Sequence, residues 1–177
     1  MKNILKILMP AALMIVVNSC NTQSGIPSDK AALLVKSGEF AFMAERANPT
    51  GNDVVNILNA LPNSSSSNVL NLDYGYTLVI KKDEIKAELP YFGRMYTPNF
   101  DTDKNSYRFT SKDFTLKETS GKKGSAVYTI QPKDLQNIRK IVLETFKNGK
   151  AYLSIEANDR QSISYDGYIT ENAAVKK

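Results

Sequence analysis

The stretch that decides the fold is Thr77-Leu-Val-Ile-Lys-Lys-Asp-Glu-Ile-Lys-Ala-Glu-Leu-Pro-Tyr-Phe-Gly-Arg-Met-Tyr96. Residues 84–89 alternate between charged and apolar side chains, which is the period of a half-buried antiparallel strand. The polar residues 81–83 predict the turn of a hairpin before this strand. Because Pro90 has no N–H group to donate to a sheet, we expect the strand to end there. Gly93 then permits a positive φ or a close approach of another group.

Large side chains cluster directly after this strand. Tyr91, Arg94 and Tyr96 lie within six residues of one another. An arginine guanidinium can bind a carboxylate or a phosphate through two hydrogen bonds, and tyrosine rings stack on ligands. We therefore predict that Tyr91, Arg94 and Tyr96 contact a ligand or a partner. The alternative is that Arg94 forms an ion pair with Glu84 or Glu88 at the end of the strand.

Two segments of the chain resemble a known family. They are Leu89-Pro-Tyr-Phe-Gly-Arg94 and Asn158-Asp-Arg-Gln-Ser-Ile-Ser-Tyr-Asp-Gly167. Together they resemble a family of bacterial lipoproteins that is defined only as a domain of unknown function, and the similarity extends from about residue 38 to residue 169. The resemblance implies a secreted, lipid-anchored, β-rich domain, and it brings no activity, substrate or catalytic residue. Met95 stands where a small residue is expected in this motif.

The rest of the chain is also rich in strand patterns. Turn signals at 121–124 and at Asn148-Gly149 separate β-rich runs, and no helix of 10 to 15 residues is indicated between strands. We therefore expect a mainly β fold, with a single antiparallel sheet of eight or nine strands that curls into a partial barrel or a sandwich. Beyond the hairpin, the expected strands are 39–47, 54–61, 106–110, 114–119, 126–131, 140–146, 151–157 and 162–169, with a serine-rich loop over 63–68.

One short helix is expected at the N-terminal side of the sheet, over residues 29–37. Ser28 is a good N-cap for this helix and Gly38 a good residue to end it. Its few apolar side chains favour packing on the domain over insertion into a bilayer. At 177 residues the chain is long enough for one well-buried domain, which we place at 28–171 with a tail over 172–177.

Residues 1–19 have the pattern of a secretory signal peptide. Two lysines flank the start of an apolar run that is too short to span a bilayer. The sequence Val17-Asn-Ser-Cys20 resembles a lipobox, in which cleavage leaves a lipidated cysteine at the new N-terminus, and Cys20 is the only cysteine. We therefore predict lipidation at Cys20, a tether over 20–27, and a membrane-anchored location in the bacterial cell envelope. The alternative is an ordinary cleaved signal with an incidental thiol.

Charge gives little indication of a nucleic-acid partner. The formal net charge is +5, and two of the lysines belong to the predicted signal peptide. This charge is too small and too dispersed for nucleic-acid binding. It is compatible with weak attraction to anionic surfaces such as phospholipid head groups, or with solubility alone.

Several catalytic chemistries are missing from the sequence. It contains no histidine, and its one cysteine is the predicted lipidation site. Ser-His-Asp and Cys-His arrangements, and zinc sites built on histidine or cysteine, are therefore excluded. A carboxylate pair of the glycosidase type remains compatible with the sequence. We predict that the protein is not an enzyme and that it has no cofactor.

The best candidate for a metal site is the run that contains Asp101, Asp103 and Asn105. These residues place oxygen ligands at positions 1, 3 and 5 of a calcium loop. However, Ser106 replaces the glycine of that loop, and Lys112 stands where the bidentate glutamate belongs. The pattern therefore favours a polar hairpin loop, and we predict no metal.

These observations predict a non-catalytic binding or accessory module of the cell envelope. Its partners would be the membrane, through the lipid anchor, and either an envelope protein or a small amphiphilic ligand inside the curled sheet. The alternatives are a carboxylate-dependent hydrolase and a purely structural envelope subunit. A closed apolar cavity would favour a ligand, paired carboxyl groups in a cleft a hydrolase, and an exposed apolar patch a partner protein.

Overall fold

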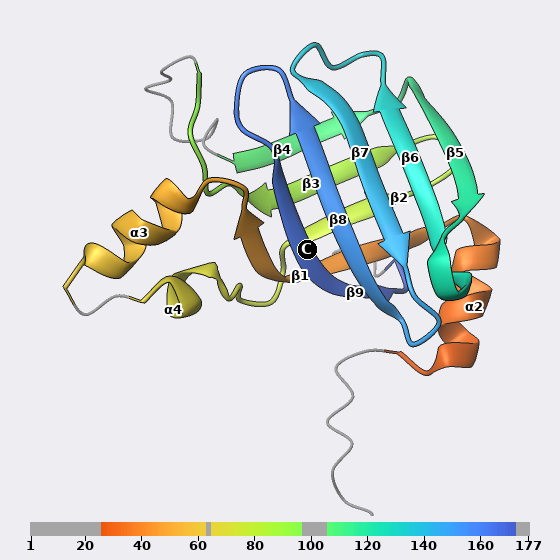
Figure 1. Cartoon of the computed structure of the whole chain (residues 1–177). Coiled ribbons are helices and arrows are strands. Elements are labelled where there is room, and N and C mark those ends of the chain that lie inside the picture. Colours follow the sequence, from red (N-terminus) through yellow and green to blue (C-terminus); the bar gives the residue numbers. More distant parts are fainter. Residues whose placement is uncertain (1–25, 63–64, 97–105, 173–177) are drawn as a thin grey trace, which may run out of the picture.

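The computed structural model describes residues 26–62, 65–96 and 106–172. These residues form nine strands in one antiparallel sheet, in the order β4-β3-β2-β1-β9-β8-β7-β6-β5 (Figure 1). The helices are α2 (Ser28–Ser37), α3 (Asn52–Ala60), α4 (Ser66–Leu70) and the short 3-10 helix η3 (Lys122–Gly124). The strands are β1 (Phe40–Pro49), β2 (Thr77–Ile80), β3 (Ile85–Pro90), β4 (Ser106–Ser111), β5 (Phe114–Ser120), β6 (Ala126–Pro132), β7 (Ile138–Thr145), β8 (Lys150–Ala157) and β9 (Ile163–Thr170).

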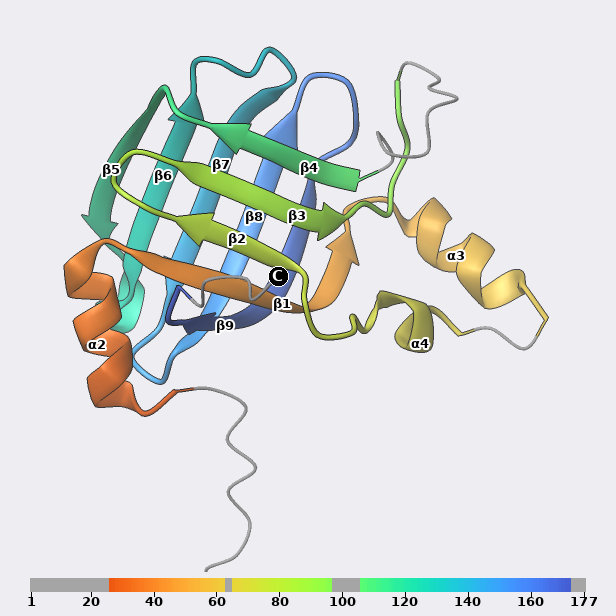
Figure 2. The same cartoon turned by 180° about the vertical axis from the view of Figure 1, so that it is seen from behind.

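The sheet curls until it nearly closes into a barrel, which confirms the predicted fold class. Strands β5–β9 form one wall, β2–β4 form the opposite wall, and β1 joins the two (Figures 1 and 2). The edge strands β4 and β5 meet at a tight corner, where the Asp134 carboxylate accepts hydrogen bonds from the Ser111 hydroxyl at 2.6 Å and the Lys112 N–H at 2.8 Å. These bonds lower the pKa of Asp134, so its charged form holds the corner.

Strand β1 can serve both walls because it bends. Its register with β9 is irregular between Ala44 and Arg46, as at a β-bulge. Opposite this bend, a Cβ atom at Gly167 would lie 2.0 Å from the carbonyl oxygen of Met43. Glycine is therefore required at position 167, because any side chain would push the two backbones apart.

The interior of the barrel is filled by side chains. Burial alternates along the strands, as in β3, where Ile85, Ala87 and Leu89 face inward. The helix α2 covers one end of the barrel through Ala31, which is buried, and the hydroxyl of Tyr128 donates to the Val35 carbonyl at 3.1 Å. The largest fully buried side chains are Tyr107, Tyr128, Tyr165, Phe40, Phe42, Leu78, Ile80, Ile85, Leu89, Ile130, Ile141 and Leu143.

The predicted hairpin and the predicted N-terminal helix are both present. Residues 81–84 connect β2 to β3, and β3 ends at Pro90 as expected. Helix α2 begins one residue before the predicted range, and its N-cap is Pro27 and not Ser28. Gly38 ends the helix with φ of 69°, a left-handed conformation that glycine adopts without strain.

Two predictions between β1 and β2 were wrong. Residues 54–61, predicted as a strand, lie mostly in α3. The apolar side chains at 54, 55 and 58 share one face of a helix, and short apolar runs of this kind do not separate helix from strand by period. Within the predicted loop at 63–68, α4 begins at Ser66, because the Ser65 side chain accepts a hydrogen bond from the Asn68 N–H at 3.2 Å and caps the helix.

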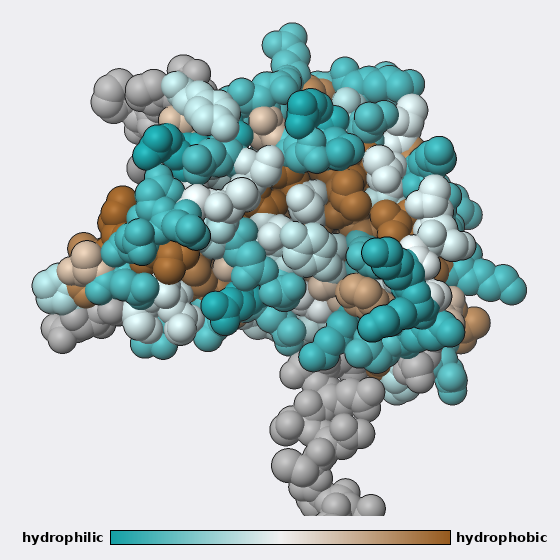
Figure 3. All heavy atoms as spheres, viewed as in Figure 1, coloured by the Kyte–Doolittle hydropathy of each residue, from teal (hydrophilic) through white to brown (hydrophobic). Residues whose placement is uncertain are grey.

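Helix α3 projects from the side of the barrel and has no buried residue. Figure 3 shows apolar side chains gathered over this side of the molecule. Ile57 and Leu61 are exposed there, whereas Val55 and Leu58 pack against the core. Among the described residues, no helix is both long enough and apolar enough to cross a membrane.

Candidate functional site

The two segments that carry the family resemblance, 89–94 and 158–167, meet at one end of the barrel. The N–H of Tyr96 donates to the Asp159 carbonyl at 2.8 Å, and the N–H of Gln161 donates to the Arg94 carbonyl at 3.0 Å. Met95 and Arg160 form an isolated antiparallel bridge between them. The chain after β3 is thus paired with the loop between β8 and β9.

Tyr91 is the residue around which this pairing is packed. Its side chain is half-buried, and its hydroxyl oxygen lies 2.9 Å from the Arg94 carbonyl oxygen and 3.0 Å from the Gln161 carbonyl oxygen. A hydroxyl has one proton, so it donates to one of the two at a time. A Cβ atom at Gly93 would lie 2.4 Å from this hydroxyl oxygen, and Gly93 does not have a positive φ. Gly93 is therefore needed for the close approach of the Tyr91 ring.

Arg160 lies beneath Tyr91 and is only 4% exposed. Its guanidinium carbon is 5.0 Å from the centre of the Tyr91 ring and 5.1 Å from that of Tyr107, distances at which a cation is attracted to a ring face. Its Nη2 donates to the Asp159 carboxylate at 2.8 Å. Burial alone would lower the pKa of Arg160, but the bonds and charge of Asp159 outweigh burial and raise it. Arg160 is therefore a permanent cation.

Three tyrosines surround this cation. Burial raises the pKa of Tyr91 to about 12, against the opposing effect of the Arg160 charge, and it also raises the pKa of Tyr107 and of Tyr165. The Tyr165 hydroxyl donates to the Pro90 carbonyl at 2.6 Å. These phenols are neutral near pH 7, so they act as packing groups and hydrogen-bond donors and not as bases.

Two buried polar atoms of the cluster have no hydrogen-bond partner in the described part of the chain. They are Nη1 of Arg160 and the hydroxyl of Tyr107. Both belong to side chains that are almost fully buried. Buried polar groups are usually paired, and ordered water is a common partner for such groups.

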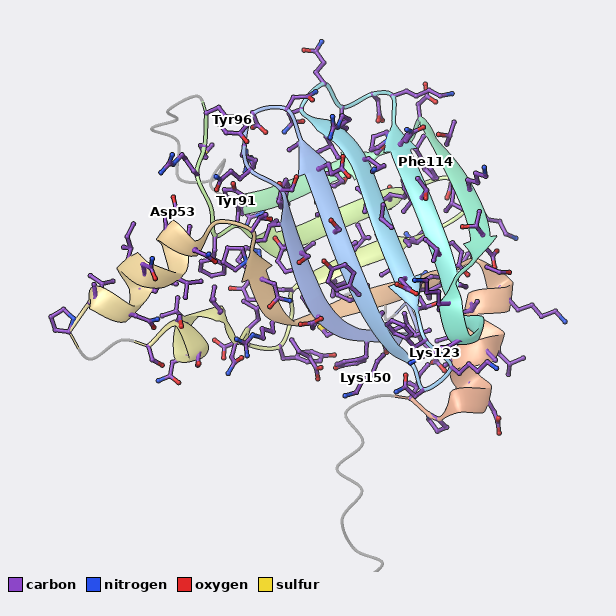
Figure 4. The ribbon with its side chains drawn as sticks, viewed as in Figure 1. Asp53, Tyr91, Tyr96, Phe114, Lys123 and Lys150 are labelled. Carbon is purple, nitrogen blue, oxygen red and sulfur yellow. The ribbon has the colours of Figure 1, made fainter. Side chains whose placement is uncertain are left out.

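Arg94 and Tyr96 are the exposed members of the predicted site. The Arg94 side chain is 67% exposed, and its Nη2 lies 2.9 Å from the Asp53 carboxylate on α3. The alternative pairing with Glu84 or Glu88 was therefore wrong, because these acids pair with lysines of their own hairpin. Tyr96 is 63% exposed. Figure 4 shows Asp53, Tyr91 and Tyr96 on the same side of the molecule.

The structure thus places the three predicted residues together but in different roles. Tyr91 is fixed against the core with Phe92, whereas Arg94 and Tyr96 face outward. Sequence reasoning missed Arg160, although it lies inside the second quoted segment. An arginine in a loop between two strands is usually solvated, and only the tertiary pairing of the two segments shows that it is buried.

The structure offers less support for the other candidate sites. The predicted calcium residues Asp101, Asp103 and Asn105 lie outside the described residues. Elsewhere in the described chain, no group of three or more acidic, histidine or cysteine side chains is arranged to hold a metal.

A hollow of about 380 Å³ lies between α2 and the ends of β6 and β7. Its lining is mainly apolar and includes Ala31, Val35 and Phe146.

The family model described as "Domain of unknown function (DUF4251)" matches residues 27–169, which include both motif segments and run from α2 into β9. The chain belongs to the DUF4251 family. A crystal structure of a DUF4251 family protein from Bacteroides eggerthii DSM 20697 is similar, with 12% sequence identity and a TM-score of 0.47. The match covers 81% of this chain and 87% of that one. No curated protein matches the sequence. The DUF4251 assignment confirms the resemblance to a family of unknown role.

Proposed function

We propose that the protein is a non-catalytic binding module of the bacterial cell envelope. It is anchored through lipidated Cys20 and contacts an envelope protein through Arg94 and Tyr96. The observation that carries this proposal is an exposed tyrosine and arginine fixed on a buried scaffold. The backbone of Tyr96 is held by Asp159, and that of Arg94 by Gln161. Tyrosine and arginine, like tryptophan, are enriched at the energetic centres of protein interfaces.

The position of this surface on the barrel supports the proposal. The pairs Ser120–Ala126 and Thr145–Ala151 place the β5–β6 and β7–β8 connections at one end of the barrel, next to α2. We call this the anchor end, because Ile26, the described residue nearest to Cys20 in the sequence, lies beside Gly149 of the β7–β8 connection. The loop at 158–162 joins the opposite ends of β8 and β9 and forms the far end. Arg94 and Tyr96 are paired with that loop, so they face away from the anchor.

A protein partner is better supported than a small ligand inside the sheet. The interior positions are taken by large side chains such as Phe40, Phe42 and Tyr128, which are fully buried. An amphiphilic ligand would need that space. A partner protein needs only an exposed surface with large, well-held side chains, which Arg94 and Tyr96 provide.

A hydrolase with paired carboxyl groups receives less support. Its general acid needs a raised pKa. Hydrogen bonds lower the pKa of Asp134 and of Glu156, which is the opposite of what a general acid needs. Asp159, the acid nearest the tyrosine cluster, is bonded to the Arg160 guanidinium. The residues near the far end therefore favour binding over acid catalysis.

The anchor is tested by the mass of the mature protein purified from its native membrane. We expect a chain that begins at Cys20 and carries added acyl mass, and we expect Cys20→Ala to leave the membrane fraction. An unmodified chain, or one that begins at another residue, would remove the anchor from the proposal.

The contact surface is tested by replacing Tyr96 with a photo-crosslinking amino acid in cells. We expect one discrete crosslinked envelope protein, and we expect Arg94→Ala to reduce its yield. The matched control places the same photo-crosslinker at Tyr74, which is 84% exposed. Tyr74 lies beside Tyr168, which pairs with Lys150 at the anchor end and not at the far end. The same crosslinked bands from both positions, or none from Tyr96, would contradict a partner surface there.

A further inference from the structure

Three segments of the chain lie together at the anchor end: α2, the turn at 121–125 and the turn at 146–149. A Cβ atom at Gly149 would lie 3.2 Å from the Ile26 carbonyl oxygen and 3.7 Å from the Ala31 Cβ. A Cβ atom at Gly124 would lie 2.7 Å from Cε of Lys147. The two turns and the start of α2 thus form one continuous surface.

This surface carries an unusual set of cations, which we call the lysine patch. All of its lysines are exposed, and each ion pair found in the described part of the chain lies outside it. Figure 4 shows two of the lysines, Lys123 and Lys150, at this end. Acids on the adjoining segments include Asp29, Glu39, Glu144 and Glu171, and Glu144 accepts a hydrogen bond from Ser125. Glu45 and Asp166 line a hollow beside Lys150, so this lysine of the patch has acids close to it. The patch consists of Lys30, Lys36, Lys122, Lys123, Lys147 and Lys150.

Apolar side chains stand among these lysines. Lys30, Leu33 and Lys36 are spaced by three residues and share the exposed face of α2, and Leu33 is 67% exposed. Phe146, in the β7–β8 turn, is 39% exposed and lines the hollow beside α2. Exposed apolar groups surrounded by lysines are the composition of surfaces that lie in the interfacial region of a bilayer. Figure 3 shows hydrophilic side chains gathered at the end of β6–β8 next to this surface.

We propose that the lysine patch docks the domain onto an anionic phospholipid surface, with Leu33 and Phe146 in contact with the interface. The proposal rests on the proposed anchor for its location: the six residue steps from Cys20 to Ile26 span at most about 22 Å, at roughly 3.6 Å per residue. The anchor therefore keeps α2 close to the bilayer. Docking through this end directs Arg94 and Tyr96 away from the membrane.

The experiment uses the full mature chain, residues 20–177, with Cys20→Ala so that no lipid is attached. Its binding is measured by sedimentation with vesicles of phosphatidylglycerol and, separately, of phosphatidylcholine. We expect binding to phosphatidylglycerol only. Binding should be lost as salt rises from about 0.01 M to about 1 M, because the screening length shortens from about 30 Å to about 3 Å.

A triple variant tests whether the patch itself is responsible. It carries Lys122→Gln, Lys123→Asn and Lys150→Gln. Asparagine is chosen because Lys123 has φ of 56°, a conformation that asparagine tolerates well. We expect its partition onto phosphatidylglycerol to fall at least tenfold, since each lysine near an anionic bilayer contributes roughly a fivefold gain.

The matched control removes three charges at the far end through Lys112→Gln, Lys133→Gln and Arg139→Gln. We expect less than about a threefold change, because these charges lie at the opposite ends of β5, β6 and β7. Equal losses in the two variants would overturn the proposal. So would wild-type binding to phosphatidylcholine that matches its binding to phosphatidylglycerol, or no binding to either. These outcomes leave the anchor untouched, because acyl mass on Cys20 is measured independently.

Discussion

The guanidinium carbon of Arg160 lies 5.0 Å from the centre of the Tyr91 ring, although the two residues come from separate segments of the chain. Their stacking joins the bend after β3 to the loop between β8 and β9. Tyr107 flanks the same guanidinium from β4, and its ring meets that of Tyr91 edge-on at 5.5 Å. One buried cation thus ties together both walls of the barrel at the end that presents Arg94 and Tyr96.

Replacing this cation should destabilise the fold strongly. We expect Arg160→Met to lower the free energy of unfolding by about 3 kcal/mol, because two rings lose their cation and Asp159 loses its partner. Urea denaturation measures the change. The matched control is Arg139→Met, which removes an exposed arginine that pairs with Glu156 and should cost less than about 1 kcal/mol. Equal effects of the two substitutions would show that Arg160 is not a structural centre.

The two buried tyrosines of the cluster should respond differently to loss of their hydroxyl groups. Tyr165→Phe leaves the Pro90 carbonyl without its donor, so we expect a loss of about 1–2 kcal/mol in the free energy of unfolding. Tyr107→Phe removes a buried hydroxyl that has no protein partner in the described chain, so its effect should stay below about 0.5 kcal/mol or be stabilising. A larger loss for Tyr107→Phe would indicate that an ordered water satisfies that hydroxyl.

Alkaline pH should unfold the protein through these same phenols. An unfolded tyrosine has a pKa of about 10, whereas burial raises the pKa of Tyr91 and of Tyr128 to about 12. The pKa of Tyr165 is raised further in the same direction. Between these values the unfolded chain has already lost protons that the folded chain keeps. The free energy of unfolding therefore keeps the full contribution of these tyrosines below about pH 10 and falls as the pH rises toward 12.

Denaturation at a series of pH values checks this prediction, and Tyr165→Phe provides its control. That variant removes one phenol that keeps its proton in the folded protein. Its free energy of unfolding should therefore fall less steeply between pH 10 and 12, by up to about 1.4 kcal/mol per pH unit. Identical slopes of the free energy of unfolding against pH in the two proteins would show that Tyr165 does not contribute to the loss of stability.

Much of the fold was predictable because local patterns and tertiary structure agree there. Alternation at 84–89 gave both the strand and its inward face, and Pro90 gave its end. The region between β1 and β2 was harder. The apolar side chains at 54, 55 and 58 are too few to establish a period, and α3 packs on the core through only one side. Such a segment depends on its tertiary contacts for its conformation.

The candidate site was predictable only in part. Tyr91, Arg94 and Tyr96 were expected together, and they are adjacent in the structure. The sequence could not separate the half-buried Tyr91 from the exposed Tyr96, because the difference depends on Arg160, which comes from a distant segment. It also could not identify Asp53 as the partner of Arg94, since that pairing requires α3 to lie beside the bend. Long-range contacts of this kind leave no periodic signal in one chain.

The last prediction separates a binding surface from a scaffold at Arg94. Its ion pair with Asp53 joins two partly exposed side chains, so Arg94→Ala should lower the free energy of unfolding by less than about 1 kcal/mol. The backbone of Arg94 keeps its hydrogen bond to Gln161 in this variant, and the Tyr91 and Arg160 stack is untouched. We therefore expect a thermal melt close to that of the wild type together with a loss of partner crosslinking from position 96.

Asp53→Ala is the companion variant, because it removes the same ion pair but keeps the guanidinium. If the guanidinium itself contacts the partner, Asp53→Ala retains crosslinking and Arg94→Ala does not. A marked loss of stability in Arg94→Ala with unchanged crosslinking would instead place Arg94 in the scaffold.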